Sequence, residues 1–219
     1  MTRLSEAVDD NDPVAIHEAL QSDPDETILI YLMTHEPLLS TMIQIVEALP
    51  FTVNRIDDDT DMLPLHYAVQ EDSYDMVNFL IENRSKINAQ DGVENSPLHY
   101  AINSPCITRL LLANGADPNL QNEDGDTPLH RAIEEENSVF DSILLLLSRG
   151  ADPKIRNAKG ESCLSLAIKK QDVRLLNTLV LHGADPNERD EEGISLIQYA
   201  NGLGLRVSIN WLREATGQR

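Results

Sequence analysis

The sequence predicts an all-α solenoid built from helix-turn-helix units, and two recurring phrases carry this prediction. The first phrase reads LPLHYA at 63–68 and returns as SPLHYA at 96–101 and TPLHRA at 127–132, about every 33 residues. The second reads GADPN or GADPK and begins at Gly115, Gly150 and Gly183. Two phrases that alternate in register indicate stacked repeats, each packing against its neighbours, so one continuous domain is expected.

Each phrase marks one end of a helix. Ser or Thr before Pro favours an N-cap, and Pro fits the first helical turn because its missing N–H has no partner there. The glycine of the second phrase favours a left-handed C-cap. Inner helices should therefore begin at the first phrase, and outer helices should end at the glycine or at Arg84, which takes its place in one unit. Degraded copies of the first phrase at 162–167 and 195–200 extend the array.

These phrases resemble those of the ankyrin-repeat family. The resemblance implies an ankyrin-repeat solenoid with short β-hairpin fingers between its helix pairs. It also assigns the phrase histidines His66, His99 and His130 to hydrogen bonds with the backbone of adjoining units. About seven units are expected, four of them close to the family pattern.

The predicted layout is an N-terminal capping unit at 1–23, a divergent helix pair at 24–56, four repeats at 57–189 and a C-terminal capping unit at 190–219. In the last unit we expect Trp211 and Leu212 to pack inward. One repeat is short around 104–105 and the next gains residues at 134–138. Both changes should fall in the turn between two helices, where a solenoid tolerates them.

No catalytic, metal or cofactor site is visible in the sequence. Three of the six histidines belong to the first phrase, and none lies near Cys or a carboxylate at metal-ligand spacing. Cys106 and Cys163 are expected to be small core thiols. We therefore expect no enzyme activity and no cofactor. The absence of a signal-peptide pattern favours a cytoplasmic or nuclear protein, or one in the host cytosol if it is a secreted effector.

Charge is the informative part of the composition, with 37 acidic and 17 basic residues and a formal net charge of −20. A generic acidic surface for solubility is one explanation. The placement of the acids favours another, because the ankyrin resemblance implies that finger tips and first helices face the partner on the concave side. The predicted partner-binding residues are Asp58, Asp59, Asp61, Tyr67, Asp91, Glu94, Tyr100, Glu123, Asp124, Asp126, Arg131, Glu161, Glu191 and Glu192.

One basic stretch interrupts the acids: Lys154, Arg156, Lys159, Lys169 and Lys170. It is either local charge compensation or a second contact patch. Nucleic acid and anionic membranes are disfavoured as partners because the chain is strongly acidic.

The sequence thus predicts a protein–protein interaction module, an adaptor, scaffold or host-targeting effector that is monomeric alone. Its acidic concave face would bind a partner with a basic surface. The alternative is a stoichiometric inhibitor or immunity protein that blocks a basic active site, including by mimicry of nucleic acid.

Overall fold

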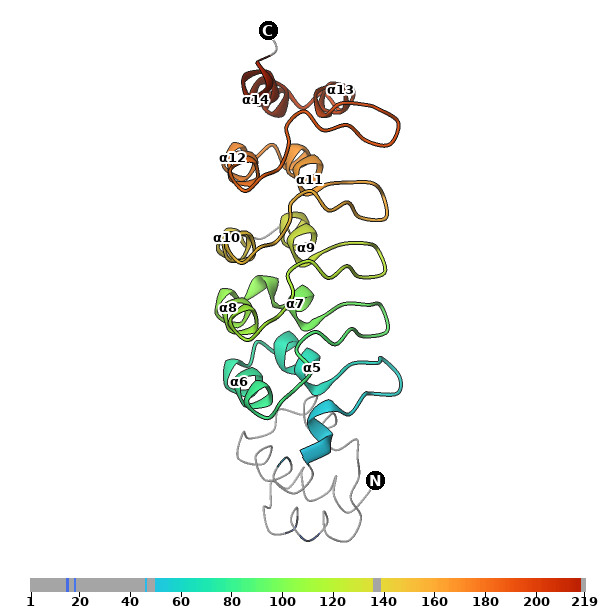
Figure 1. Ribbon diagram of the computed structural model, residues 1–219, viewed down its shortest axis with the longest axis vertical. Coiled ribbons are helices and arrows are strands. Elements are labelled where there is room, and N and C mark those ends of the chain that lie inside the picture. The colour runs from blue at the N-terminus through green and yellow to red at the C-terminus, as the bar shows by residue number, and fades with distance from the viewer. Residues whose placement is uncertain (1–14, 16–17, 19–45, 47–49, 136–138, 218–219) are drawn as a thin grey trace. The chain divides into compact units, whose positions relative to one another are not determined.

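The computed structural model describes residues 50–135 and 139–217, together with the single positions Ala15, Glu18 and Val46. The predicted capping unit at 1–23 and most of the divergent pair at 24–56 lie outside these residues. In the described ranges the chain is all-helical, with isolated β-bridges in place of strands. It forms two compact units, and Figure 1 labels their helices. Unit 1 contains the described residues up to Ala101 and residues 113–116, and unit 2 contains residues 102–112 and those from Asp117 onward.

Unit 1 packs short helices around leucine side chains. Its α5 helix packs against both α6 and α7. Leu65 and Leu80 are fully buried, and Leu98 is 1% exposed. The elements of unit 1 are η1 (Pro50–Asn54), α5 (Pro64–Gln70), α6 (Tyr74–Glu82) and α7 (Pro97–Tyr100).

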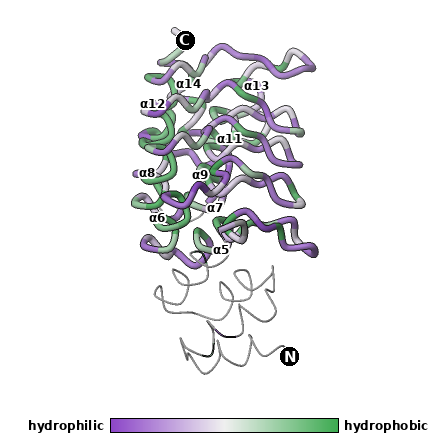
Figure 2. The backbone as a smooth tube through the Cα atoms, turned by 60° about the horizontal axis from the view of Figure 1, so that its bottom comes forward, coloured by the Kyte–Doolittle hydropathy of each residue, from purple (hydrophilic) through white to green (hydrophobic). Residues whose placement is uncertain are grey.

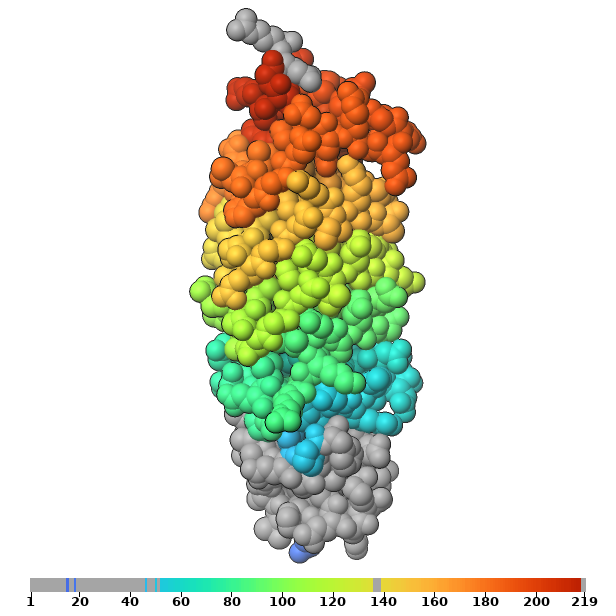
Figure 3. All heavy atoms as spheres, in the orientation of Figure 1, coloured from blue at the N-terminus to red at the C-terminus, as the bar shows by residue number. Residues whose placement is uncertain are grey.

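Besides α8, unit 2 contains three inner helices (α9, α11 and α13) and three outer helices (α10, α12 and α14). The inner α11 packs against α9, α12 and α13, and α14 packs against α12 and α13. In Figure 3 the side chains of this unit form successive layers, yellow-green to dark red. Its elements are η2 (Ala101–Asn103), α8 (Pro105–Ala113), α9 (Pro128–Glu134), α10 (Phe140–Ser148), α11 (Cys163–Lys170), α12 (Val173–Leu181), α13 (Leu196–Gly202) and α14 (Arg206–Thr216).

Helix ends follow the predicted rules. Thr127, Ser162 and Ser195 are N-caps whose hydroxyls accept a hydrogen bond from the amide three residues later. The C-terminal glycines Gly115, Gly150 and Gly183 have φ of 91°, 91° and 103°. Arg84 adopts φ 66° at the corresponding position. Because L-residues with a Cβ are strained there, Arg84 is a weak point of the array.

Both length changes fall between helices, as predicted. Three residues separate α5 from α6, whereas in the short repeat Ser104 alone separates η2 from α8. In the long repeat, residues 135–139 separate α9 from α10.

The C-terminal helix closes unit 2 with buried side chains. Trp211 is 8% exposed and Leu212 is fully buried. The indole Nε1 of Trp211 donates to Asn177 Oδ1 at 2.8 Å, and the Ser208 hydroxyl donates to the Ile168 carbonyl at 2.7 Å. The helix is therefore fixed to its neighbours by both apolar and polar contacts.

The two cysteines differ in their surroundings. Cys163 is fully buried in α11, and burial raises the pKa of its thiol. Cys106 is exposed near the start of α8, so the expectation of a core thiol is wrong at this position. The reason is that Cys106 lies on an outer helix, one residue after its first position, where the side chain faces away from the core.

Asparagine side chains join one repeat to the backbone of the next. In unit 1, Asn54 Nδ2 donates to the Arg84 carbonyl at 3.1 Å, and its Oδ1 accepts from the Lys86 amide at 2.7 Å. In unit 2, Asn119 forms the same two bonds with the Gly150 carbonyl and the Asp152 amide, at 3.0 and 2.8 Å.

Candidate functional site

The most polar parts of the described chain are five fingers, the segments that lead into the inner helices. They comprise residues 55–63 and 86–96 in unit 1, and 117–127, 152–162 and 185–195 in unit 2. Figure 2 shows that the finger tips are hydrophilic, whereas the helices carry the hydrophobic positions. The finger tips are therefore the most hydrophilic part of each unit.

An Asp or Asn at the base holds each finger closed. Asp91 Oδ1 accepts from the amides of Val93 and Asn95, at 3.0 and 2.9 Å. Asn157 and Asp190 form equivalent bonds with the amides two and four residues later. These side chains satisfy the amides of a tight turn, which fixes the direction of the tip.

Two predicted partner-binding residues belong to this internal framework. Asp91 is 5% exposed and Asp126 is 3% exposed. Asp126 Oδ1 accepts from Asn157 Nδ2 of the next finger at 2.9 Å. The prediction that these two carboxylates face a partner is therefore corrected, because Asp91 bonds to amides of its own finger and Asp126 bonds to the next finger.

The two predicted tyrosines also make internal contacts. Tyr67 and Tyr100 are half-buried. The Tyr100 hydroxyl donates to Asp91 Oδ2 at 2.6 Å, and the Tyr67 hydroxyl donates to Asp57 Oδ2. This bond from Tyr67 lowers the pKa of Asp57, so its carboxyl remains ionised.

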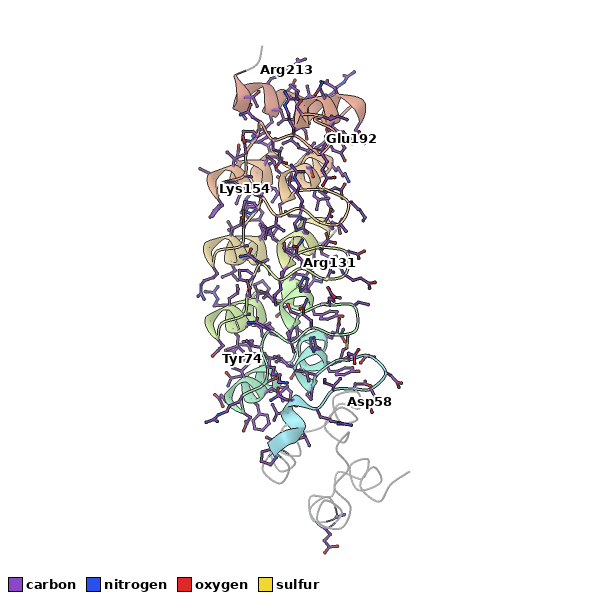
Figure 4. The ribbon with its side chains drawn as sticks, turned by 45° about the vertical axis from the view of Figure 1, so that its right-hand side comes forward. Asp58, Tyr74, Arg131, Lys154, Glu192 and Arg213 are labelled. Atoms are coloured by element: carbon purple, nitrogen blue, oxygen red, sulfur yellow. The ribbon has the colours of Figure 1, made fainter. Side chains whose placement is uncertain are left out.

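The remaining acids lie on the exposed tips. Asp58 lies on the first finger and Glu192 on the fifth (Figure 4). Glu161 differs, because it is half-buried and forms an ion pair with Lys169. Arg131 is exposed on α9. The exposed acidic tip residues are Asp58, Asp59 and Asp61 on the first finger, Glu94 on the second, Glu123 and Asp124 on the third, and Glu191 and Glu192 on the fifth.

Two of these tip acids occupy positions that favour glycine. Asp61 has φ 55° and Glu94 has φ 61°. The same place near the tip is taken in unit 2 by Gly125, Gly160 and Gly193, with φ between 71° and 78°. A residue with a Cβ costs about 1–2 kcal/mol there, so unit 1 carries its acids at the expense of stability.

Direct hydrogen bonds set the tips in register within each unit. The Gly92 amide donates to the Thr60 carbonyl at 3.0 Å, joining the first and second fingers. In unit 2 the Ala158 amide donates to the Asp124 carbonyl at 2.8 Å. Neighbouring tips are thus presented as pairs with fixed spacing.

Most side chains of the basic stretch bond to neighbouring protein groups. Arg156 donates to the carbonyls of Gly160 and Arg189 at 2.6 and 3.0 Å. Lys170 donates to the carbonyls of Glu134 and Glu135, at the end of α9. Lys169 forms an ion pair with Glu161. These contacts support charge compensation within the stretch. The two remaining basic residues, Lys154 and Lys159, are exposed.

The phrase histidines His66 and His130 act as predicted by the resemblance. His66 Nε2 lies 3.1 Å from the Ala89 carbonyl, and His130 Nε2 lies 3.2 Å from the Glu161 carbonyl. Their Nδ1 atoms accept from the N-cap amides of Leu63 and Thr127. Burial lowers the pKa of both imidazoles, which favours the neutral form that this geometry requires.

The described ranges contain no group of three His, Cys, Asp or Glu side chains that could hold a metal ion. Among their helices, none is both long and apolar enough to cross a bilayer.

Comparisons with known proteins identify the repeat type. A family model described as ankyrin repeats (3 copies) matches residues 4–91 and 98–190. An ankyrin repeat protein of fowlpox virus is 37% identical over 84 residues, which cover 36% of this chain and 11% of the viral protein. The E3 ubiquitin-protein ligase hecd-1 of Caenorhabditis elegans is 35% identical over 101 residues, 45% of this chain and 4% of the ligase.

A third similar protein is human transient receptor potential cation channel subfamily A member 1. It is 34% identical over 92 residues, which cover 40% of this chain and 8% of the channel. The aligned region is thus a small part of each of these relatives. The similarity concerns the repeats.

Proposed function

We propose, since the chain belongs to the ankyrin-repeat family of protein-interaction modules, that its acidic finger tips bind a protein with a basic surface. The observation that carries this proposal is the pair Asp61 and Glu94. Each places a carboxylate on a left-handed backbone position where the fingers of unit 2 have glycine. Strained backbone positions of this kind cluster at binding and active sites.

The charge of the whole chain supports the same partner. A net charge of −20 attracts basic proteins over distances of about 10 Å at moderate ionic strength. Such complementarity raises the association rate and excludes acidic competitors more than it adds affinity. An adaptor that selects basic partners fits these properties.

Matched charge variants test the proposal. The tip variant replaces Asp58, Asp59, Glu123 and Asp124 with Asn or Gln. The control neutralises four exposed acids on outer helices, Asp75, Glu82, Asp141 and Glu214, so both variants have the same net charge.

Proteins captured from a lysate are first identified with the parent chain, and their association with all three chains is then measured by surface plasmon resonance. We expect the tip variant to associate about tenfold more slowly at low salt, with a smaller effect at high salt. The control should stay within about twofold of the parent. Equal slowing by both variants would contradict the proposal, because it would assign the effect to net charge alone.

The identity of the captured protein, and its activity with and without this chain, separate an adaptor from an inhibitor. An inhibitor should capture one dominant enzyme or toxin and reduce its activity at one-to-one stoichiometry, whereas an adaptor leaves the activity of its partner intact.

A further inference from the structure

One inner helix of unit 2 lacks the histidine that its neighbour uses to reach the next finger. At the start of α9, His130 Nε2 lies 3.2 Å from the Glu161 carbonyl. The equivalent residue of α11 is Ser165, whose hydroxyl donates to the carbonyl of Ser162 at 2.8 Å. Serine is too short to reach the next finger, so the place of the imidazole is left open.

A pocket of about 150 Å³ lies at this place. Ser165 and Ile194 line it, and they correspond in the repeat to His130 and Glu161, the two residues joined by the imidazole one repeat earlier. Leu196 and Tyr199 of α13 provide further walls. The pocket therefore follows from the degraded first phrase at 162–167.

A second substitution brings a carboxylate into the same pocket. Glu188 occupies the position that Ile155 has in the preceding finger, where the side chain is apolar. Its Oε1 accepts from the Ser162 hydroxyl, and its Oε2 lies 3.4 Å from an Arg156 nitrogen. Burial raises the pKa of Glu188, against the opposing effects of Ser162 and Arg156.

The charges of the residues that line the pocket, Glu188 included, are nearly balanced. Arg156 and Lys159 line it together with Glu161, Glu188 and Asp190, which leaves one excess negative charge among the lining residues. Lys169 pairs with Glu161 from outside the lining. The Asp190 carboxylate is engaged through Oδ1 with the amides of its own finger. Glu188 is thus a half-buried carboxylate in the lining of the pocket.

We infer that this pocket receives one basic side chain of the bound protein, whose N–H groups donate to the Glu188 carboxylate. A cation with N–H donors fits in the space of the missing imidazole and adds a favourable charge next to a half-buried carboxylate. The inference rests on the proposed function, because it names one contact within the interface with a basic partner. It goes beyond general attraction to the finger tips, because the pocket selects for shape and for hydrogen-bond donors.

The test uses small cations as surrogates of a basic side chain and the full chain as the receptor. Methylguanidinium and methylammonium carry N–H donors, whereas tetramethylammonium carries the same charge without them. Each is titrated at constant ionic strength while amide chemical shifts are followed by NMR. We expect saturable shifts at the pocket amides of Gly160, Ser165 and Tyr199 with the two donor cations and none with tetramethylammonium.

Two variants connect these shifts to the pocket. Ser165→His combined with Glu188→Ile restores the residue types of the preceding interface, His130 and Ile155, and should abolish saturable binding while circular dichroism stays unchanged. Glu188→Gln keeps the shape of the side chain and should weaken binding about tenfold through loss of a charged acceptor.

Three results would overturn the inference: shifts that grow linearly with concentration, equal shifts with tetramethylammonium, or an unchanged affinity for the donor cations in Glu188→Gln. A failure here differs from a failure of the proposed function. If the tip variant loses its partner but the pocket binds no cation, only this inference falls. If the pocket binds donor cations but the tip variant associates normally, the finger-tip proposal falls instead.

Discussion

The two glycines Gly125 and Gly160 provide a direct test of how closely neighbouring fingers pack. Both have left-handed backbones, with φ of 71° and 74°. A Cβ at Gly125 would lie 2.5 Å from the amide nitrogen of Ala158 on the next finger, whereas a Cβ at Gly160 meets nothing within 4 Å. Alanine at each position therefore imposes the same backbone strain, and only one substitution adds a clash.

The expected difference can be worked out from these contacts. A Cβ in left-handed backbone costs about 1–2 kcal/mol, which is the full expectation for Gly160→Ala. For Gly125→Ala the fingers must separate, which adds about 1–3 kcal/mol of overpacking. Separation also weakens the Ala158–Asp124 hydrogen bond of 2.8 Å, worth about 1 kcal/mol. The total for Gly125→Ala is about 3–6 kcal/mol.

Urea unfolding followed by ellipticity at 222 nm measures both free energies of unfolding, provided that the urea dependence is unchanged between variants. A larger loss for Gly125→Ala than for Gly160→Ala would support the close approach of the third and fourth fingers. Equal losses would refute the reasoning, because they would show that these fingers can move apart without cost.

Three further predictions concern stability. Arg84→Gly should raise the free energy of unfolding by about 1 kcal/mol in urea titrations, because glycine relieves the left-handed strain; no gain would show that the arginine is unstrained. Burial lowers the pKa of His130 below its ordinary 6.5, so its stabilising effect is present above pH 6.5 and is lost as the pH falls through the lowered pKa. The advantage of the parent over His130→Gln should therefore shrink between pH 7.5 and 5.5 in thermal melts, and a constant advantage would contradict this. Amides of 102–112, after the shortened α7, should exchange with deuterium faster than those of 164–181, and uniform protection would show that the irregular repeat is equally firm.

The helical framework could be predicted from the sequence because it depends on local chemistry. N-caps such as Thr127, C-terminal glycines such as Gly150 and the phrase histidines each act within a few residues or on the adjacent backbone. The left-handed conformation of Arg84 could be predicted for the same reason, since the repeat fixes the conformation at that position regardless of the residue.

The candidate site was less predictable, because exposure depends on how each finger folds back. Asp91 and Asp126 are acidic in the sequence like Asp59 and Glu94, yet only the latter two face solvent. A signal was present, since an Asp or Asn recurs five residues before the N-cap, at Asp91, Asn122, Asn157 and Asp190. The pocket at Ser165 required the structure, because its carboxylate comes from Glu188 of a different finger.

The asparagine links between repeats bear on how such a chain can evolve. Asn54 and Asn119 bond to main-chain atoms of the following repeat, which every amino acid except proline provides. A joint of this kind is indifferent to side-chain identity on the neighbouring repeat. Repeats can therefore be duplicated or lost, or have their tip residues substituted, without a compensating substitution in the neighbouring repeat. A new binding specificity can arise in one finger while the joints that hold the stack stay the same.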